Sequence, residues 1–133
     1  MASLAVDTVE RRIRTLLQEQ RRLVASLLLL RQQMRGSLFT RYGRCGKAGC
    51  TCRTGEPHGP YYVLSTRSAG EGGFTYLERG KMGEMRELVG AYRLFRKGLR
   101  QLRTLNGELV RLLARYQQAA ARKTERRVIL RAS

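Results

Sequence analysis

All three cysteines and the only histidine of this 133-residue chain lie within fourteen residues, as Cys45, Cys50, Cys52 and His58. Thiolate sulfur and imidazole nitrogen are ligands that Zn²⁺ prefers, and three cysteines with one histidine are a common set for a tetrahedral structural site. Four protein ligands leave no position for water, so the spacing predicts a structural zinc and not a catalytic one.

Other interpretations of the same residues remain open. The cysteines can be small buried apolar residues, or three of them can hold an iron–sulfur cluster. His58 can be the fourth ligand, or it can cap the turn before Gly59 and Pro60. Zinc is favoured because the segment is too polar to form a core, and an odd number of closely spaced cysteines argues against disulfides. Thiols kept reduced indicate a cytoplasmic protein, and no apolar signal segment follows the N-terminus.

Two long helices flank this segment. The first is predicted over residues 7–35 and the second over 81–122, because apolar residues in both alternate at spacings of three and four. Gln20 and Asn106 are polar residues within these seams, and Gly90, Gly98 and Gly107 lie off the second one. The predicted seams are Val9, Ile13, Leu16, Gln20, Leu23, Leu27, Leu30 and Met34, and Met85, Leu88, Tyr92, Phe95, Leu99, Leu102, Asn106, Leu109, Leu113 and Tyr116.

The remaining residues complete a single predicted domain. Residues 36–60 form the Cys/His knuckle, and 61–78 form a β-hairpin with strands at 61–66 and 74–77 around a glycine-rich loop. Residues 123–133 form a basic tail that we expect to be disordered without an acidic partner. The predicted fold class is therefore mainly α, with two heptad-patterned helices in an antiparallel hairpin or coiled coil, joined by a zinc-stapled knuckle and a small β-hairpin.

The first helix is apolar nearly all round at Leu27, Leu28, Leu29 and Leu30. Such a helix is normally covered from more than one side. We therefore expect either a homo-oligomer, such as a dimer forming a four-helix bundle, or docking on a larger protein. No membrane partner is expected, because the apolar positions form a narrow seam without an aromatic interfacial face.

The charge indicates a polyanionic partner. The chain has 27 Lys and Arg against 10 Asp and Glu, a net charge of +17, which is typical of proteins that bind nucleic acid. Basic and aromatic residues interleave in the knuckle, and six basic residues lie off the seam of the second helix. The predicted nucleic-acid contacts are Arg41, Tyr42, Arg44, Lys47, Arg53, Arg86, Arg93, Arg96, Lys97, Arg100 and Arg103. Tyr42 can equally pack on the knuckle.

Catalysis is not expected. The acidic residues do not form metal-binding or general acid–base pairs, and the chain has no P-loop, no dinucleotide fingerprint and no nucleophile elbow. A nuclease would need carboxylates for its metal ions.

The blocks CGKAGCTC and HGPYYVLS, followed by a helix with a leucine heptad, resemble a prokaryotic family of small, basic, uncharacterised proteins with a CGKxxCxC…HGPYY motif. The resemblance covers about residues 38–113. It implies that Cys45, Cys50, Cys52 and His58 act together, with Gly59, Pro60 and Tyr61 as a structural turn. It also implies genes near mobile elements.

These observations lead to one functional hypothesis and one alternative. The first is a non-enzymatic protein that binds RNA or DNA, mainly through phosphates, as an accessory subunit of a mobile-element or ribonucleoprotein complex in the cytoplasm or nucleoid. The alternative is a coiled-coil adaptor that docks on a larger enzyme, such as a transposase or reverse transcriptase.

Overall fold

The structure is a computed structural model that describes residues 2–66 and 72–132. It is mainly helical, with a small three-stranded antiparallel sheet. The sequence predicts one domain, and the contacts divide the chain into two compact units, Met1–Leu29 with Arg96–Ser133, and Leu30–Phe95. Each unit is described by itself. In the part of the chain that is described, no helix combines the length and apolar character needed to cross a membrane.

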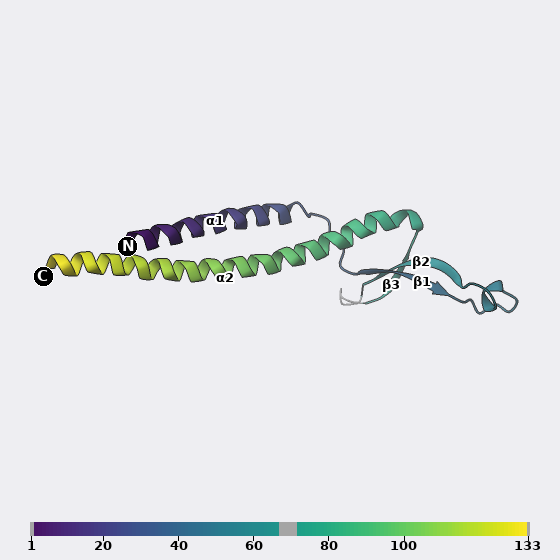
Figure 1. The fold of residues 1–133 in the computed structure, drawn as a ribbon. Coiled ribbons are helices and arrows are strands. Elements are labelled where there is room, and N and C mark those ends of the chain that lie inside the picture. The colour runs from purple at the N-terminus through teal and green to yellow at the C-terminus, as the bar shows by residue number, and fades with distance from the viewer. Residues whose placement is uncertain (1, 67–71, 133) are drawn as a thin grey trace. The chain divides into compact units, whose positions relative to one another are not determined.

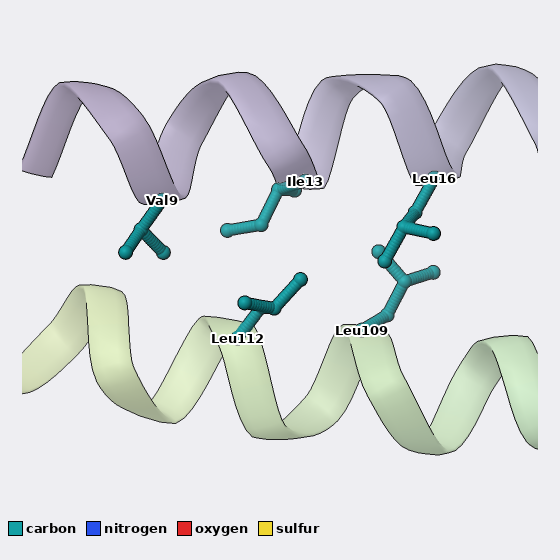
Figure 2. Close-up of a cluster of buried hydrophobic side chains, with 5 residues drawn as sticks. All are labelled: Val9, Ile13, Leu16, Leu109 and Leu112. Atoms are coloured by element: carbon teal, nitrogen blue, oxygen red, sulfur yellow. The ribbon is translucent and has the colours of Figure 1, made fainter.

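The first unit is built from α1 (Ala2–Leu28) and the part of α2 (Met82–Ala132) that begins at residue 96. The two helices lie side by side (Figure 1). Their facing side chains form one apolar cluster, in which each fully buried leucine contributes roughly 1.5–3 kcal/mol. Figure 2 shows these side chains pointing toward one another from the two helices; they are Val9, Ile13, Leu16, Leu109 and Leu112.

Two polar contacts show that the helices run in opposite directions. The Arg12 guanidinium lies 3.0 Å from the Glu108 carboxylate, and the Gln20 amide donates a hydrogen bond of 2.8 Å to the Asn106 side-chain oxygen. The partner number falls as the position in α1 rises, so the contact is antiparallel. Gln20 and Asn106, the two polar residues of the predicted seams, therefore meet one another.

Part of the predicted α2 seam does not face α1. At these positions the preceding residue of α2 faces α1 instead. Leu112 is buried and Leu105 packs against the cluster, whereas Leu99 and Leu113 are 37% and 52% exposed. The second helix carries two neighbouring apolar rows, one residue apart. The row that contacts α1 is the one that becomes buried. The helical spacing of apolar residues does not indicate which of the two rows this is.

Gly98 was predicted to lie off the seam. In the structure it lies on the face of α2 that contacts α1. A Cβ atom at Gly98 would clash with Leu27 Cδ2, so the absence of a side chain lets Leu27 approach the α2 backbone. Leu27 is buried accordingly. The glycine therefore has a packing role that a seam of large apolar residues does not indicate.

Both helices have ends that differ from the prediction of 7–35 and 81–122. The first begins at Ala2 and ends at Leu28, where the Leu29 amide donates to the Ser26 carbonyl. In the second unit, the Met34 amide donates to the Leu88 carbonyl of α2, at 3.0 Å, so the segment before Gly36 is not helical. This backbone contact replaces the helical hydrogen bonds that the predicted extension would have made.

The basic tail is helical, because α2 continues to Ala132. The expectation of a disordered tail over 123–133 is wrong for the residues described. No glycine or proline follows Gly107, and alanine, arginine, lysine, glutamine and glutamate are good helix formers. Nothing in the local sequence therefore stops the helix at residue 122.

The sheet of the second unit has the strand order β1-β2-β3, with β1 at Ser37–Gly43, β2 at His58–Ser65 and β3 at Phe74–Leu77. Both strand pairs are antiparallel. The expected hairpin corresponds to β2 and β3, and most of its loop lies outside the described residues. The first strand was missed, because the sequence analysis placed its residues in the knuckle. Two short 3₁₀ helices lie at Thr51–Arg53 and Arg79–Lys81.

Gly36 starts the sheet and does not stop a helix. Its φ of 151° is one that glycine favours. A Cβ atom there would stand 2.7 Å from the Ser65 carbonyl oxygen and 2.8 Å from Leu64 Cδ1. Gly36 therefore lets the chain enter β1 against the end of β2.

The approach of Leu27 to Gly98 gives a prediction on stability. Gly98→Ala and Gly107→Ala each gain about 1 kcal/mol of helix propensity. At Gly107 the new methyl would meet only Arg111 Nη1 at 3.6 Å, whereas at Gly98 it must displace Leu27. We expect the free energy of unfolding of Gly98→Ala to lie about 1–3 kcal/mol below that of Gly107→Ala, the cost of overpacking. Urea unfolding followed by circular dichroism measures both, and equal stabilisation would contradict this role of Gly98.

Candidate metal centre and basic surface

The predicted ligands come together. The three Sγ atoms of Cys45, Cys50 and Cys52 and a ring nitrogen of His58 all lie within 4.8 Å of one another. Cys45 Sγ is 3.4 Å from Cys52 Sγ, and Cys50 Sγ is 3.2 Å from His58 Nε2. A tetrahedral zinc site has sulfur–sulfur and sulfur–nitrogen separations of roughly 3.8 and 3.5 Å. The cluster could therefore hold a metal ion, with Nε2 as the histidine donor.

Regular elements hold the ligands at both ends of the cluster. Cys45 lies two residues after the end of β1, Cys52 lies in the 3₁₀ helix Thr51–Arg53, and His58 is the first residue of β2. Gly43 of β1 pairs with His58 across the ladder, so the strand pairing brings the Cys45 side of the loop to His58. Cys52 is the deepest ligand, with 1% of its surface exposed.

Arg44 braces the same loop. Its guanidinium donates hydrogen bonds to the carbonyl oxygens of Cys52 and Gly55. Charged donors make stronger hydrogen bonds than neutral ones, and both acceptors belong to the segment that carries Cys52. Arg44, which the sequence analysis assigned to nucleic acid, therefore has a structural role within the knuckle.

The cysteine environments push the thiol pKa values apart. The pKa of Cys50 is lowered from 9.0 to about 6, first by the Cys52 backbone N–H and then by hydrogen bonds from the side chains of Cys45, Cys52 and His58. Burial raises the pKa of Cys52. A metal ligand must be a thiolate. Of these two thiols, Cys50 is the one whose surroundings favour the thiolate.

The other predicted nucleic-acid residues of the knuckle have separate surroundings. Arg41 donates a hydrogen bond of 3.0 Å to the Tyr76 hydroxyl. Tyr42 is exposed, and its Cδ1 atom lies 3.0 Å from the Cβ position of Gly59, so its ring packs beside the knuckle. Lys47 and Arg53 are exposed.

The predicted basic residues of α2 are all exposed. They are Arg86, Arg93, Arg96, Lys97, Arg100 and Arg103. Arg86 and Arg93 belong to the second unit, and the other four belong to the first. They form a second candidate surface, defined by charge on a helix and not by a pocket.

The predicted interface patch does not form one continuous helical surface. Leu27 is buried against α2, and Leu28, the last residue of α1, is exposed. Leu29 and Leu30 follow the helix end, where Leu29 is exposed and Leu30 is half-buried. Only Leu28 of this patch therefore remains as an exposed residue on the helix itself.

The sheet also carries an aromatic surface that was not predicted from the sequence. Its members are Phe39, Tyr61, Phe74 and Tyr76. Tyr61 and Tyr76 also line a pocket of about 450 Å³ with Arg41, Arg44, Cys45 and His58. Phe74 and Tyr76 alternate in β3, which is a sequence signal for such a face. The missing β1 hid the contribution of Phe39 and Arg41.

Together, fold and site define a basic, mainly helical protein with a Cys₃His cluster at the end of a small antiparallel sheet. The model of the family described as "Domain of unknown function (DUF6788)" matches residues 6–87, which is more than half of the chain. The chain therefore belongs to the DUF6788 family. The match includes most of α1, the whole sheet and the Cys/His cluster, and it ends in the second turn of α2. Searches of curated proteins and of solved structures found no match.

The ligand geometry gives a prediction for zinc. Cys50→Ser should lower the zinc affinity by more than the roughly 10- to 100-fold typical of losing an outer-shell partner, because a thiolate ligand itself is lost. The ladder between β1 and β2 should then lose amide-exchange protection. Zinc content after competition with a chelator measures the first effect. Ala48→Ser is the matched control, since Ala48 is exposed and belongs to the same loop. Full zinc retention by Cys50→Ser would remove the ligand assignment.

His58 is tested by a pair of variants. His58→Ala should lose zinc as Cys50→Ser does, whereas His58→Cys should retain it, because four sulfur ligands also form tetrahedral zinc sites. Cobalt(II) in place of zinc reports the ligand set through its visible absorption, which should change from the Cys₃His to the Cys₄ pattern in His58→Cys. If His58→Ala keeps both the zinc affinity and the wild-type cobalt spectrum, His58 is not a ligand.

Proposed function

We propose that this protein binds nucleic acid without catalysing a reaction on it, and that it acts as an accessory subunit of a mobile-element or ribonucleoprotein complex. The Cys₃His cluster is proposed to hold a structural zinc that fixes the knuckle. The observation that carries the proposal is the long basic face of α2, in a chain with a net charge of +17.

The basic face extends beyond the six residues predicted from the sequence, because α2 continues to Ala132. Residues three, four, seven or eleven apart share a side of a helix. Within the first unit, six exposed residues meet this rule over roughly 44 Å of helix, at 1.5 Å per residue. They are Lys97, Arg100, Arg111, Arg115, Arg122 and Arg126.

This arrangement favours a phosphate backbone over solvent as the partner. A solvated helix usually carries both signs of charge. Two acidic residues, Glu108 and Glu125, lie along this stretch of α2. Glu108 lies in an ion pair with Arg12, so Glu125 is left against six basic side chains. Contacts to phosphates position a protein but carry no sequence information, so binding through this face would be largely independent of sequence. Both RNA and DNA offer this chemistry.

A salt titration tests the basic face. Each phosphate contact contributes about 0.9 to the slope of log K against log salt for duplex DNA and about 0.7 for a single strand. Replacing Arg100, Arg111 and Arg115 with glutamine should therefore weaken binding and reduce the slope by roughly two to three. The charge-matched control replaces Arg11, Arg21 and Arg22 of α1. Equal reductions for the two triple variants would mean that net charge, and not the α2 face, determines binding.

A second candidate function is protein association, and a specific surface favours it. In α1, Leu17, Val24 and Leu28 are exposed, and in α2 so are Leu99, Val110 and Leu113. The three residues of α1 lie four, seven or eleven positions apart. The three residues of α2 lie three, eleven or fourteen positions apart. Each set therefore lies on one side of its helix. These six residues define the apolar flank.

The hydrogen bond between Gln20 and Asn106 brings both halves of the apolar flank to the same side of the helix pair. Gln20 stands between Leu17 and Val24 on α1, and Asn106 lies seven residues from both Leu99 and Leu113. Helices with a second apolar row beside their contact row are typical of four-helix bundles. We propose that a second copy covers this flank, in an antiparallel coiled-coil assembly; a larger enzyme served by an adaptor is the other candidate.

Light scattering tests the association. Val24→Gln combined with Leu113→Gln should turn a dimer into a monomer, because both substitutions place polar groups in the interface. Thr104→Gln is the control, since Thr104 is exposed and lies about 160–200° around α2 from Asn106 and Leu113. A wild-type protein that is monomeric at all concentrations would reject the four-helix bundle and leave the adaptor.

A further inference from the structure

One face of the sheet gathers four exposed aromatic residues of the second unit. Side chains alternate between the two faces along a strand, and the register pairs Phe39 with Val63 and Val63 with Tyr76. Arg41 pairs with Tyr61, and Ser65 pairs with Phe74. The residues that share this face are Ser37, Phe39, Arg41, Tyr61, Val63, Ser65, Phe74 and Tyr76, and we call it the aromatic face.

The aromatic rings of this face are exposed. Phe39 and Tyr61 are 39% and 43% exposed, and Phe74 and Tyr76 are 51% and 57% exposed. Val63 is the only aliphatic side chain of the face, and it is 1% exposed. The accessible part of the surface therefore consists of aromatic rings, an arginine and two serine positions, and it offers almost no aliphatic surface.

Ring contacts hold the aromatic side chains in place. Phe39 and Phe74 meet edge to face with their ring centroids 5.9 Å apart, and Tyr61 and Tyr76 do so at 6.1 Å. Such pairs are favourable geometries for aromatic side chains. Because each pair joins two strands, the rings are fixed before any ligand binds, which lowers the entropy cost of binding.

Arg41 and the adjoining pocket add charge to this face. The Arg41 guanidinium is held by the Tyr76 hydroxyl at 3.0 Å. Arg41, Tyr61 and Tyr76 line the pocket of about 450 Å³, to which Cys45 and His58 of the Cys/His cluster also contribute. This volume falls within the range of small-ligand sites. Residues 36–60 carry four basic residues and one acidic residue, a net charge of +3.

We propose that the aromatic face binds single-stranded nucleic acid, with unpaired bases stacked on Tyr61 and Tyr76 and a phosphate beside Arg41. This inference rests on the proposed function and names its ligand class. Base–aromatic stacking beside a positive surface is how single strands are bound without strong sequence preference. A duplex keeps its bases stacked on one another, so it cannot offer them to these rings.

The charge and composition of the face decide between this ligand and a protein. An apolar protein surface would bury aliphatic area, which the face does not expose. A ligand that combines flat aromatic rings with negative charge complements both the tyrosines and Arg41. Single-stranded RNA and single-stranded DNA share this chemistry.

The experiment compares the binding of single-stranded and duplex oligonucleotides to the full chain. Tyr61→Leu removes the ring, and Tyr61→Phe keeps it as the matched control. The probes are oligo(U), oligo(dT) and a DNA duplex, each of about 12 nucleotides, within the range of known single-strand sites. Zinc content and circular dichroism of each variant establish that it is folded.

We expect Tyr61→Leu to bind the single strands about 5- to 150-fold more weakly, which corresponds to the loss of one stacked base. The salt slope and the affinity for the duplex should not change, because stacking involves no counterion release. Tyr61→Phe should bind as the wild type does. Arg41→Gln should lower the slope for single strands by about 0.7. Oligo(U) and oligo(dT) report whether RNA or DNA binds more tightly.

A second readout uses the wild-type protein alone. The chain has no tryptophan, so tyrosine emission is directly visible, and stacked bases should quench it. Single strands should quench the emission at salt concentrations where the duplex, although bound, does not.

Tyr76→Leu and Tyr76→Phe repeat the comparison on the neighbouring ring.

The binding results distinguish an error about the aromatic face from an error about the proposed function. If single strands and duplex bind with a steep salt dependence but Tyr61→Leu and Tyr76→Leu change nothing, the aromatic face is not the site and the basic face of α2 remains. If neither class of oligonucleotide binds, both proposals are wrong. If Tyr61→Leu abolishes self-association and leaves oligonucleotide binding intact, the face binds a second copy and the inference is overturned.

Discussion

The closure of the loop between β1 and β2 is the constraint on which the second unit depends. Only Val63 and Leu64 of the sheet are buried apolar residues, which is too little to hold three strands by hydrophobic burial alone. The four ligand atoms lie within 4.8 Å of one another, so a metal ion bound there would cross-link the end of this strand pair. Arg44 adds two hydrogen bonds inside the same loop. The pairing of Arg41 with Tyr61, and hence the aromatic face, follows from a loop that brings Gly43 back to His58.

In the first unit, the packing of the two helices must overcome repulsion among their many basic side chains. Its buried cluster is a single row of side chains between two helices, and a small buried area provides limited stability. The close approach at Gly98, the Gln20–Asn106 hydrogen bond and the Arg12–Glu108 ion pair all act along this row. The exposed ion pair contributes little by itself. A second copy on the apolar flank would bury more apolar area and would explain why both helices carry a second apolar row.

The sequence predicted best what is local. The Cys/His cluster could be recognised because its four residues lie within one short loop, where spacing limits geometry. The existence of two helices also followed from period alone. Their ends did not, because no glycine or proline marks Leu28 or residue 122, and the contact of Met34 with Leu88 is tertiary. The choice between the rows of Leu112 and Leu113 likewise depends on where α1 lies. The strand β1 was missed because its residues lie just before the cysteines and were assigned to the knuckle.

The arginines have different surroundings, so the net charge of the chain does not tell how many of them are available to a partner. Arg12 pairs with Glu108 and Arg14 with Glu10, so these two are partly neutralised by neighbours. Arg44 binds backbone carbonyls of the knuckle, and Arg41 is held by a tyrosine at the edge of the aromatic face. Composition counts these four side chains alike, although two stabilise helical packing or a helix turn, one braces a loop and one is oriented toward a pocket. A polyanion would therefore meet two surfaces of different chemistry, a row of basic side chains on α2 that matches phosphates, and an aromatic sheet face that matches bases.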